Sequence, residues 1–400
     1  MGKPEIRFKG FTDDWEQRKL GEVIEDYVEK TTVENQYPVL TSSQQMGIVL
    51  QDDYFSGDRV SQSGNIGYFV IPRGYFAYRS RSDNDVFVFN RNDCIDKGSI
   101  SYFYPVFKPS GVDSDFLLRR LNYGLETQLK IASEGTGQHV LSLKKFKNMT
   151  ALFPSINEQR KIGEYFTRLD HLITLHQRKC DEVKTLKKYM LQKMFPQNGM
   201  NIPEIRFSGF TDVWEQRKFP EFVSFFNGLT YTPDDVQDTG TLVLRSSNVK
   251  NGEIVDADNV YVSDKVVISE NVQKGDIIVV VRNGSRALIG KHAQIKAFMP
   301  NTVIGAFMTG LRSEQSSFVN ALLDTSAFEK EIAKNMGATI NQITGYMFSK
   351  MEFMIPSEKE QQKIGDYFTN LDHLITLHQR KCDELRKMKK FMLQNMFPKE

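Results

Sequence analysis

Side chains suited to nucleic-acid contact gather between residues 73 and 84 of this 400-residue chain. They stand beside aromatic residues and comprise Arg73, Tyr78, Arg79, Ser80, Arg81 and Ser82. Arginine, serine and asparagine are the side chains that contact base edges and phosphates. A solvated turn after a strand accounts for the same residues equally well. Because the net charge of the chain is only +2, DNA binding would require the basic residues to cluster on one face.

The second half of the chain offers comparable polar groups. A turn between two apolar strands carries Arg282, Asn283, Ser285 and Arg286, and an earlier strand is followed by Arg245, Ser246 and Asn248. Two late Gly-rich loops add Thr136 and Gln138 in the first half, and Thr339, Asn341 and Gln342 in the second. Their amides suit contacts with adenine or with the DNA backbone. A capped polar connection explains these loops at least as well.

Motifs for catalysis are missing from the sequence. No Asp/Asn-Pro-Pro-aromatic tetrapeptide for amino methylation occurs, and no convincing glycine motif for a methyl donor accompanies one. The segment 284–292, GSRALIGKH, has five residues between its glycines, and His292 replaces the Ser or Thr that would hold magnesium. Pro233-Asp234-Asp235 has no nearby acidic-x-Lys motif of a nuclease. We therefore predict no catalytic residues on this chain.

Four residues raise the question of a metal. His176 and Cys180, and again His378 and Cys382, stand four apart in two long helical segments, so facing helices could supply four ligands. Small or adaptable residues on a helix seam explain the same spacing more simply, and we predict no metal. With Cys94 the chain has three cysteines, which do not form a disulfide framework.

An internal repeat determines how these groups must be positioned. The fourteen residues LDHLITLHQRKCDE occur at 169–182 and again at 371–384. In a second repeat, the segment PEIRFKGFTDDWEQRK at 4–19 recurs as PEIRFSGFTDVWEQRK at 203–218. Between the echoes the two halves show almost no similarity. The chain is a duplication in which common frames hold two different inserts.

The repeated frames predict two long helices. From Glu158 to Phe195 apolar residues step by alternating threes and fours, and no proline occurs before Pro196. Thirty-eight residues correspond to ~57 Å of helix. A helix of that length with a narrow apolar stripe needs a partner, and its own copy is the nearest. The duplication favours an antiparallel coiled coil with pseudo-twofold symmetry, in which the front segment 4–19 lies by the end of the second helix.

The inserts read as α+β domains of similar plan, each with strand and turn patterns followed by helical segments. We expect a first domain at 1–154, a helix at 155–198, a second domain at 199–356 and a second helix at 357–400. Hydrophobic residues make up 40% of the chain and no run approaches the ~18 apolar residues of a membrane span. The N-terminal residues lack the apolar core of a signal peptide, so we expect a cytoplasmic protein.

The frames resemble those of a known family. The pattern P-x-I-R-F-x-G-F-x-x-x-W, and the helix starts EQRKI at 158–162 and EQQKI at 360–364, are similar to those of the specificity subunits of bacterial type I restriction-modification systems, the staphylococcal ones above all. The resemblance covers the whole chain. It implies that each insert is a target recognition domain that reads half of a bipartite DNA site.

The resemblance also implies partners. The conserved helices would separate the two readers and dock two methyltransferase subunits, and restriction subunits would join the complex. S-adenosylmethionine, ATP and magnesium would belong to those partners, with no cofactor on this chain. Helix length would then act as a ruler for the unread gap. The alternative is a structural adaptor that binds protein through two domains on a helical rod.

Overall fold

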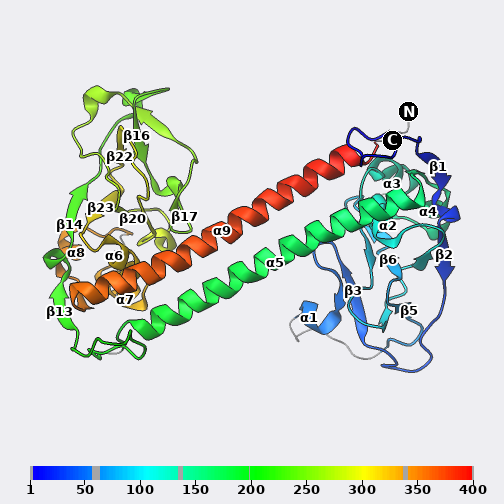
Figure 1. Ribbon diagram of the computed structural model, residues 1–400, viewed down its shortest axis with the longest axis horizontal. Coiled ribbons are helices and arrows are strands. Elements are labelled where there is room, and N and C mark those ends of the chain that lie inside the picture. Colours follow the sequence, from blue (N-terminus) through cyan, green and yellow to red (C-terminus); the bar gives the residue numbers. More distant parts are fainter. Residues whose placement is uncertain (1–2, 56–63, 134–137, 198, 337–340, 399–400) are drawn as a thin grey trace. The chain divides into compact units, whose positions relative to one another are not determined.

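The computed structural model describes residues 3–55, 64–133, 138–197, 199–336 and 341–398. The chain divides into two compact units of about 200 residues. Unit 1 comprises residues 1–176 and 380–400, and unit 2 comprises residues 177–379. The long helices α5 (Ile156–Met194) and α9 (Glu358–Met396) each contribute one part to each unit (Figure 1). Each begins one residue after and ends four residues before the segment expected for it, at 155–198 and at 357–400, and the prediction of two long helices is confirmed.

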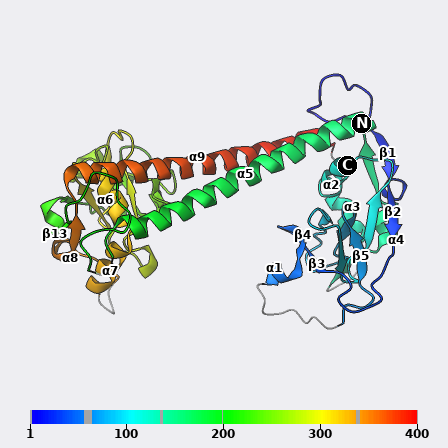
Figure 2. The same ribbon diagram turned by 60° about the horizontal axis from the view of Figure 1, so that its bottom comes forward.

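In unit 1 the insert forms two four-stranded sheets and two small strand pairs. One sheet has the order β4-β3-β9-β5 and contains the parallel pair β3 and β9, whereas the order β2-β10-β6-β8 is antiparallel throughout. Figure 2 shows α1 beside β3 and β4. The strands are β1 (Glu16–Lys19), β2 (Ile24–Tyr27), β3 (Val39–Ser43), β4 (Gly47–Leu50), β5 (Phe69–Pro72), β6 (Phe76–Tyr78), β7 (Arg81–Ser82), β8 (Phe89–Arg91), β9 (Lys97–Ile100), β10 (Val106–Pro109), β11 (His139–Val140) and β12 (Thr150–Phe153); the helices are α1 (Gln51–Phe55), α2 (Ser114–Leu121), α3 (Glu126–Ala132) and α4 (Leu143–Asn148).

Unit 2 follows the same plan with an unlike sequence. Its sheet β14-β23-β20-β21 corresponds to β2-β10-β6-β8, and its sheet β15-β19-β16-β22 again contains one parallel pair, β16 with β22. The strands are β13 (Glu215–Lys218), β14 (Ser224–Asn227), β15 (Val236–Gln237), β16 (Thr241–Leu244), β17 (Val249–Lys250), β18 (Glu253–Ile254), β19 (Val260–Val262), β20 (Ile277–Val280), β21 (His292–Gln294), β22 (Thr302–Ile304), β23 (Met308–Arg312) and β24 (Glu352–Ile355); the helices are α6 (Ser316–Leu323), α7 (Ser326–Asn335) and α8 (Gly345–Lys350). The predicted α+β class is confirmed.

The two long helices run antiparallel within each unit. In unit 1 the Nζ of Lys389 lies 2.5 Å from a carboxylate oxygen of Asp170, and the ring of Phe397 packs on Phe166. As residue numbers rise along α5 from 166 to 170, the residues that they contact fall from 397, just after α9, to 389 within it. In unit 2 the equivalent ion pair joins Lys187 to Asp372 at 2.6 Å. Asp372 and Lys389 lie 202 residues after Asp170 and Lys187, so the two ion pairs are related by the pseudo-twofold duplication.

The repeated front segments close each unit. In unit 2 the segment 203–218 follows α5 along the chain, and the amide of Ile205 donates to the carbonyl of Lys193. In unit 1 no chain link joins the segment 4–19 to α9, yet the amide of Ile6 donates to the carbonyl of Asn395 in the same way. The predicted placement of the front segment by the end of the second helix is confirmed.

A buried ion pair ties each front segment to the start of a long helix. The guanidinium of Arg7 contacts both carboxylate oxygens of Glu158 at 2.7 Å, and Arg206 contacts Glu360 with the same geometry. Each glutamate side chain is only 1% exposed. Hydrogen bonding to Glu158, and to Glu360 in the copy, raises the pKa of each arginine. Each glutamate therefore favours the charged form of its arginine.

Glycines in the first turns of the long helices allow a second helix to approach closely. A Cβ atom at Gly163 of α5 would lie 2.6 Å from Oδ1 of Asp113 and 3.0 Å from the amide of Phe116. At Gly365 of α9 a Cβ atom would lie 2.7 Å from the amide of Phe318. These distances are too short for any real side chain. The repeat keeps glycine at both positions because α2 and α6 pack there.

Aromatic clusters fill both cores at this contact. In unit 1 Trp15 packs edge-on against Phe116 and Phe397, with ring centroids 5.8 and 6.1 Å apart. In unit 2 Trp214 takes the same place beside Phe195 and Phe318. Each core therefore needs a front segment, an insert and both long helices. Among the described helices, none combines the length and apolar character needed to cross a lipid bilayer.

Candidate nucleic-acid interface

A polar cavity of about 650 Å³ opens in the insert of unit 1. It lies where the parallel strand β3 ends, and the last residues of β3 together with the turn after them form one wall. The opposite wall comes from the turn after β6. The polar lining residues are Thr41, Ser42, Ser43, Gln44, Gln45, Arg79, Arg81, Ser82, Asp83, Asn84 and Asn90. Hydroxyl, amide and guanidinium groups in one hollow can donate to and accept from base edges.

Three of the predicted residues meet at this cavity, namely Arg79, Arg81 and Ser82. The guanidinium of Arg81 lies over the ring of Phe103, with its carbon 4.3 Å from the ring centroid. Arg79 and Arg81 are both exposed, and neither forms an ion pair with any residue that the structure describes. Their N–H groups are therefore available to a ligand.

The other predicted residues of this cluster serve the domain itself. Tyr78 is fully buried, its hydroxyl donates to the carbonyl of Leu141 at 3.0 Å, and burial raises the pKa of its phenol. Ser80 donates to the carbonyl of Phe103, and Arg73 pairs with Asp96 on the surface. The structure does not bring these three predicted residues to the cavity.

The late loop of unit 1 reaches the same turn. Strand β11 pairs with β7, so that Val140 lies opposite Arg81 and His139 lies opposite Ser82. The amide of Gln138 donates to Asp83 at 3.1 Å, beside the cavity. Thr136, which the sequence placed in this loop, and Thr339 in the second loop lie outside the described residues. Gln138 is thus close to Arg81 despite 57 residues of separation.

Unit 2 contains a matching cavity of about 660 Å³ at the end of its own parallel strand, β16. Arg245 and Ser246 line it, together with Ser247, Tyr231 and Phe307. Arg245 forms an ion pair with Asp258 at 2.6 Å, which fixes its guanidinium. Asn248 is fully buried and its amide donates to the carbonyl of Ala257. Asn248 therefore shapes the loop and cannot face a ligand.

The second predicted turn and the second late loop meet beside this cavity. The guanidinium carbon of Arg282 lies 5.1 Å from the ring centroid of Phe307, and Arg282 forms a β-bridge with Gln342. Asn341 donates to the carbonyl of Gly284 at 3.2 Å, and Asn283 donates to Ser246 at 3.3 Å.

Two further residues of the second turn remain at its surface. The amide of Ser285 donates to Asn283, and the Arg286 side chain is exposed without an ion pair among the described residues. The turn therefore presents two guanidinium groups, those of Arg282 and Arg286, for which the described residues supply no carboxylate partner.

Sequence reasoning missed the segment from Thr41 to Gln45, which is the end of β3 and the start of the turn after it. Its signal was a short echo inside the otherwise unlike inserts: VLTSSQ at 39–44 matches VLRSSN at 243–248. Both copies end the parallel strand of a sheet, and both deliver two serines to a cavity wall. In unit 1 the amide of Asn90 holds this loop through Ser42 and the carbonyl of Ser43.

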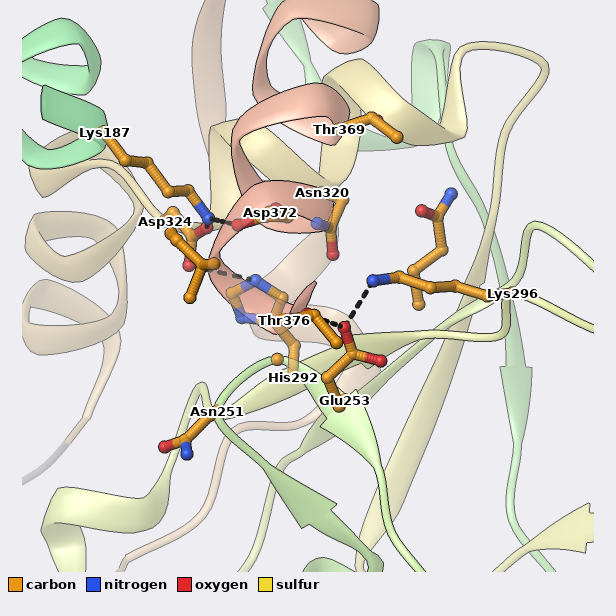
Figure 3. A pocket seen from close by; sticks show the side chains of 13 residues that line it. Lys187, Asn251, Glu253, His292, Lys296, Asn320, Asp324, Thr369, Asp372 and Thr376 are labelled. Carbon is orange, nitrogen blue, oxygen red and sulfur yellow. Dashed lines mark hydrogen bonds and ion pairs between the residues drawn. The ribbon is translucent and has the colours of Figure 1, made fainter. Parts of the chain in front are cut away.

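A different polar cluster joins the insert of unit 2 to the long helices (Figure 3). The Nζ of Lys187 lies 2.7 Å from Asp324 and 2.6 Å from Asp372. Burial alone would lower the pKa of Lys187, but the two carboxylates outweigh it and the pKa is raised. Nearby, Glu253 accepts hydrogen bonds from Lys296 and Thr376. These contacts are satisfied internally, and their role is to attach the insert.

The helix cysteines pack in the seam. The Sγ of Cys180 lies 3.8 Å from the carbonyl oxygen of Ile375, and the Sγ of Cys382 lies 3.6 Å from that of Ile173. Both thiols are fully buried. Within the part of the chain that the structure describes, no three His, Cys, Asp or Glu side chains are grouped to hold a metal ion.

Comparison with known proteins adds a family to this geometry. A family model described as "Type I restriction modification DNA specificity domain" matches residues 12–185 and again residues 211–387. The specificity subunit of the type I restriction enzyme MjaVIII from Methanocaldococcus jannaschii is 23% identical over 281 residues, which are 66% of this chain and 65% of that protein. The EcoKI specificity subunit from Escherichia coli is 27% identical over 37% of this chain and 34% of its own length. The chain thus spans somewhat less than two thirds of the first relative.

Solved structures show the same fold. The S subunit of a type I restriction-modification system from M. genitalium superposes with a TM-score of 0.67 at 12% identity, over 100% of both chains. A chain from a study of complex assembly and conformational transition of the type I R-M system superposes with a TM-score of 0.50 at 16% identity, over 97% of this chain and 98% of the other.

Proposed function

Because the chain belongs to the type I restriction-modification DNA specificity family, we propose that it is the non-catalytic specificity subunit of such a system, acting in the cytoplasm. Each insert would read one half of a bipartite DNA site. The observation that carries the proposal is the repeated cavity. Two domains with unlike sequences present two serines and an exposed arginine on a phenylalanine at equivalent places.

The charge distribution supports DNA as the ligand. The chain is nearly neutral overall, yet Arg79, Arg81, Arg282 and Arg286 are exposed beside the cavities and form no ion pair with any described residue. Unpaired guanidinium groups can bind phosphate or guanine in a planar, bidentate manner. A reader with few free cations would obtain additional phosphate contacts from its partners.

The long helices carry exposed apolar side chains that fit the expected partners. Leu186 and Tyr189 are 43% and 48% exposed on α5 in unit 2, and their copies Met388 and Phe391 are 48% and 54% exposed on α9 in unit 1. Residues three apart lie on one helix face. We propose that each such pair docks one methyltransferase subunit, which explains why the duplication retains both. Restriction subunits would join this complex, and S-adenosylmethionine, ATP and magnesium would bind to the partners.

Coexpression with a compatible methyltransferase subunit in a methylation-free bacterium tests the proposal. We expect N6-methyladenine in a single bipartite motif, methylated on both strands and mapped by single-molecule sequencing. Replacing residues 219–356 by a second copy of residues 20–154 should convert the motif to two copies of one half-site. A soluble complex that methylates no motif would contradict the proposal and favour an adaptor that binds protein.

A further inference from the structure

We infer that Arg81 and Arg282 make the same contact in the two half-sites, a bidentate contact to a DNA phosphate that positions each domain without reading a base. This inference rests on the proposed function and assigns roles within it. Those cavity residues that differ between the domains, such as Thr41 in place of Arg245, are then left to discriminate the bases.

Backbone hydrogen bonds establish that the two arginines are equivalent. The amide before each turn donates to a phenylalanine carbonyl, from Ser80 to Phe103 at 2.9 Å and from Val281 to Phe307 at 3.0 Å. Arg81 and Arg282 each follow that amide by one residue. The late loop also crosses at the same point, since Val140 pairs with Arg81 and Gln342 pairs with Arg282. Three chain segments, namely the turn, the phenylalanine segment and the late loop, therefore meet in the same way around each arginine.

The packing of the two guanidinium groups suits a bidentate ligand. Each lies over a phenylalanine face, at 4.3 Å for Arg81 and 5.1 Å for Arg282, within the range of a cation–π contact. Such stacking holds the plane of the group and leaves its edge free. No described carboxylate pairs with either group. A fixed planar fork with unused N–H donors matches two oxygens of one phosphate.

The contrast between shared and unshared residues favours phosphate over base. Thr41 in unit 1 stands where unit 2 has Arg245, and Arg79 stands where unit 2 has Val280. The arginine on phenylalanine is retained while these neighbours change. Two different half-sites have their sugar-phosphate backbone in common, whereas their bases differ. A retained contact therefore corresponds to the backbone, since phosphate contacts fix register and base contacts specify sequence.

Salt dependence distinguishes the two kinds of contact. In the full chain assembled with its methyltransferase subunit, we would measure Kd for DNA with the mapped motif and for scrambled DNA between 50 and 200 mM salt. Arg81→Ala and Arg282→Ala should each weaken binding to both DNAs by the same factor, on the order of tenfold. Each should also reduce the slope of log affinity against log salt concentration by about 1. The methylated motif should stay unchanged, and Arg81→Lys, which keeps the charge but loses the planar fork, should retain the salt slope and recover only part of the affinity.

Control variants remove the same charge elsewhere. Arg73→Ala in unit 1 and Arg217→Ala in unit 2 break exposed ion pairs away from the cavities and should leave both affinities and the salt slope unaltered. The inference is overturned if Arg81→Ala or Arg282→Ala relaxes the motif at one base position, or weakens motif DNA without weakening scrambled DNA. Those outcomes would leave the proposed function standing. If the unaltered complex showed no preference for motif DNA over scrambled DNA, both this inference and the proposed function would be refuted.

Discussion

The ion pair between Arg7 and Glu158 should hold the front segment of unit 1 in place. In unit 1 this segment is not joined to α9 by the chain, so its attachment depends on side-chain and backbone contacts. Arg7→Ala leaves the carboxylate of Glu158 buried and without its bidentate partner. The matching variant Arg206→Ala does the same to Glu360 in unit 2, where the segment follows α5 directly.

The expected loss is large for a single side chain. Removing one partner of a buried ion pair costs ~3–5 kcal/mol, because the remaining charge stays out of water. The carboxylate of Glu158 is 1% exposed and accepts two bonds of 2.7 Å, so the full effect applies. In a unit of this size ~1 kcal/mol shifts the melting temperature by roughly 2–4 °C, so a loss of ~3 kcal/mol lowers it by roughly 6–12 °C.

Intrinsic fluorescence can follow each unit separately, since the chain has two tryptophans and each unit contains one. In a Trp214→Phe background Trp15 reports unit 1, and in a Trp15→Phe background Trp214 reports unit 2. Arg7→Ala should lower the melting temperature that Trp15 reports for unit 1. The melting temperature that Trp214 reports for unit 2 should not change. The exposed pair of Lys3 with Asp14 lies in the same segment, so Lys3→Ala is the control, with an expected cost below ~1 kcal/mol.

The reasoning is refuted if Arg7→Ala shifts the Trp15 transition by no more than Lys3→Ala does. A shift of equal size in the Trp214 transition would also refute it, because the pair would then not act on unit 1 alone. Arg206→Ala should give the reverse pattern.

Four further outcomes follow from the fold. Gly163→Ala should destabilise unit 1 by thermal unfolding although alanine favours helices, because its Cβ would meet α2; a gain near ~1 kcal/mol would contradict this. Of the three thiols, only Cys94 should react rapidly with an aromatic disulfide reagent, and Cys94→Ser should abolish the fast phase. Since the pKa of Lys187 is raised on folding, its contribution to the stability of unit 2 is present below pH 10.5 and is lost as pH rises through the raised value; Lys187→Met should lack that alkaline loss. Deleting seven residues from both α5 and α9 should shorten each helix by ~10 Å and change the unread gap by about three base pairs or abolish binding, and an unchanged gap would exclude the ruler.

Local sequence patterns were sufficient to predict the long helices. Their apolar positions recur with helical spacing, proline marks their ends, and the duplication supplies the partner stripe. The buried seam residues Ile162, Phe166 and Cys180 follow that spacing. The α+β class of the inserts could also be predicted, because alternating apolar residues and turn residues define the strands locally.

The cavity residues could be predicted from the sequence only in part. Arg81 and Arg282 could be identified by residue type, but residue type does not indicate whether a side chain is buried. Tyr78 and Asn248 resemble surface contacts in sequence, yet tertiary packing buries both and uses their polar atoms internally. The segment from Thr41 to Gln45 carries no charge, and its only sequence signal is the short match of VLTSSQ to VLRSSN. The fold of β3 brings this segment to the same cavity as Arg81.

The division of the chain into units bears on how it is made. Unit 2 is one continuous stretch, whereas unit 1 requires residues 380–400 to meet residues 1–176. At ~5–20 residues per second a ribosome needs roughly 10–45 s between His176 and Phe397, whose ring completes the aromatic cluster around Trp15. The first insert synthesised is therefore the last to be completed, and its apolar surface waits exposed while unit 2 folds. A nascent chain stopped near Gln379 would carry a finished second reader and an unfinished first one.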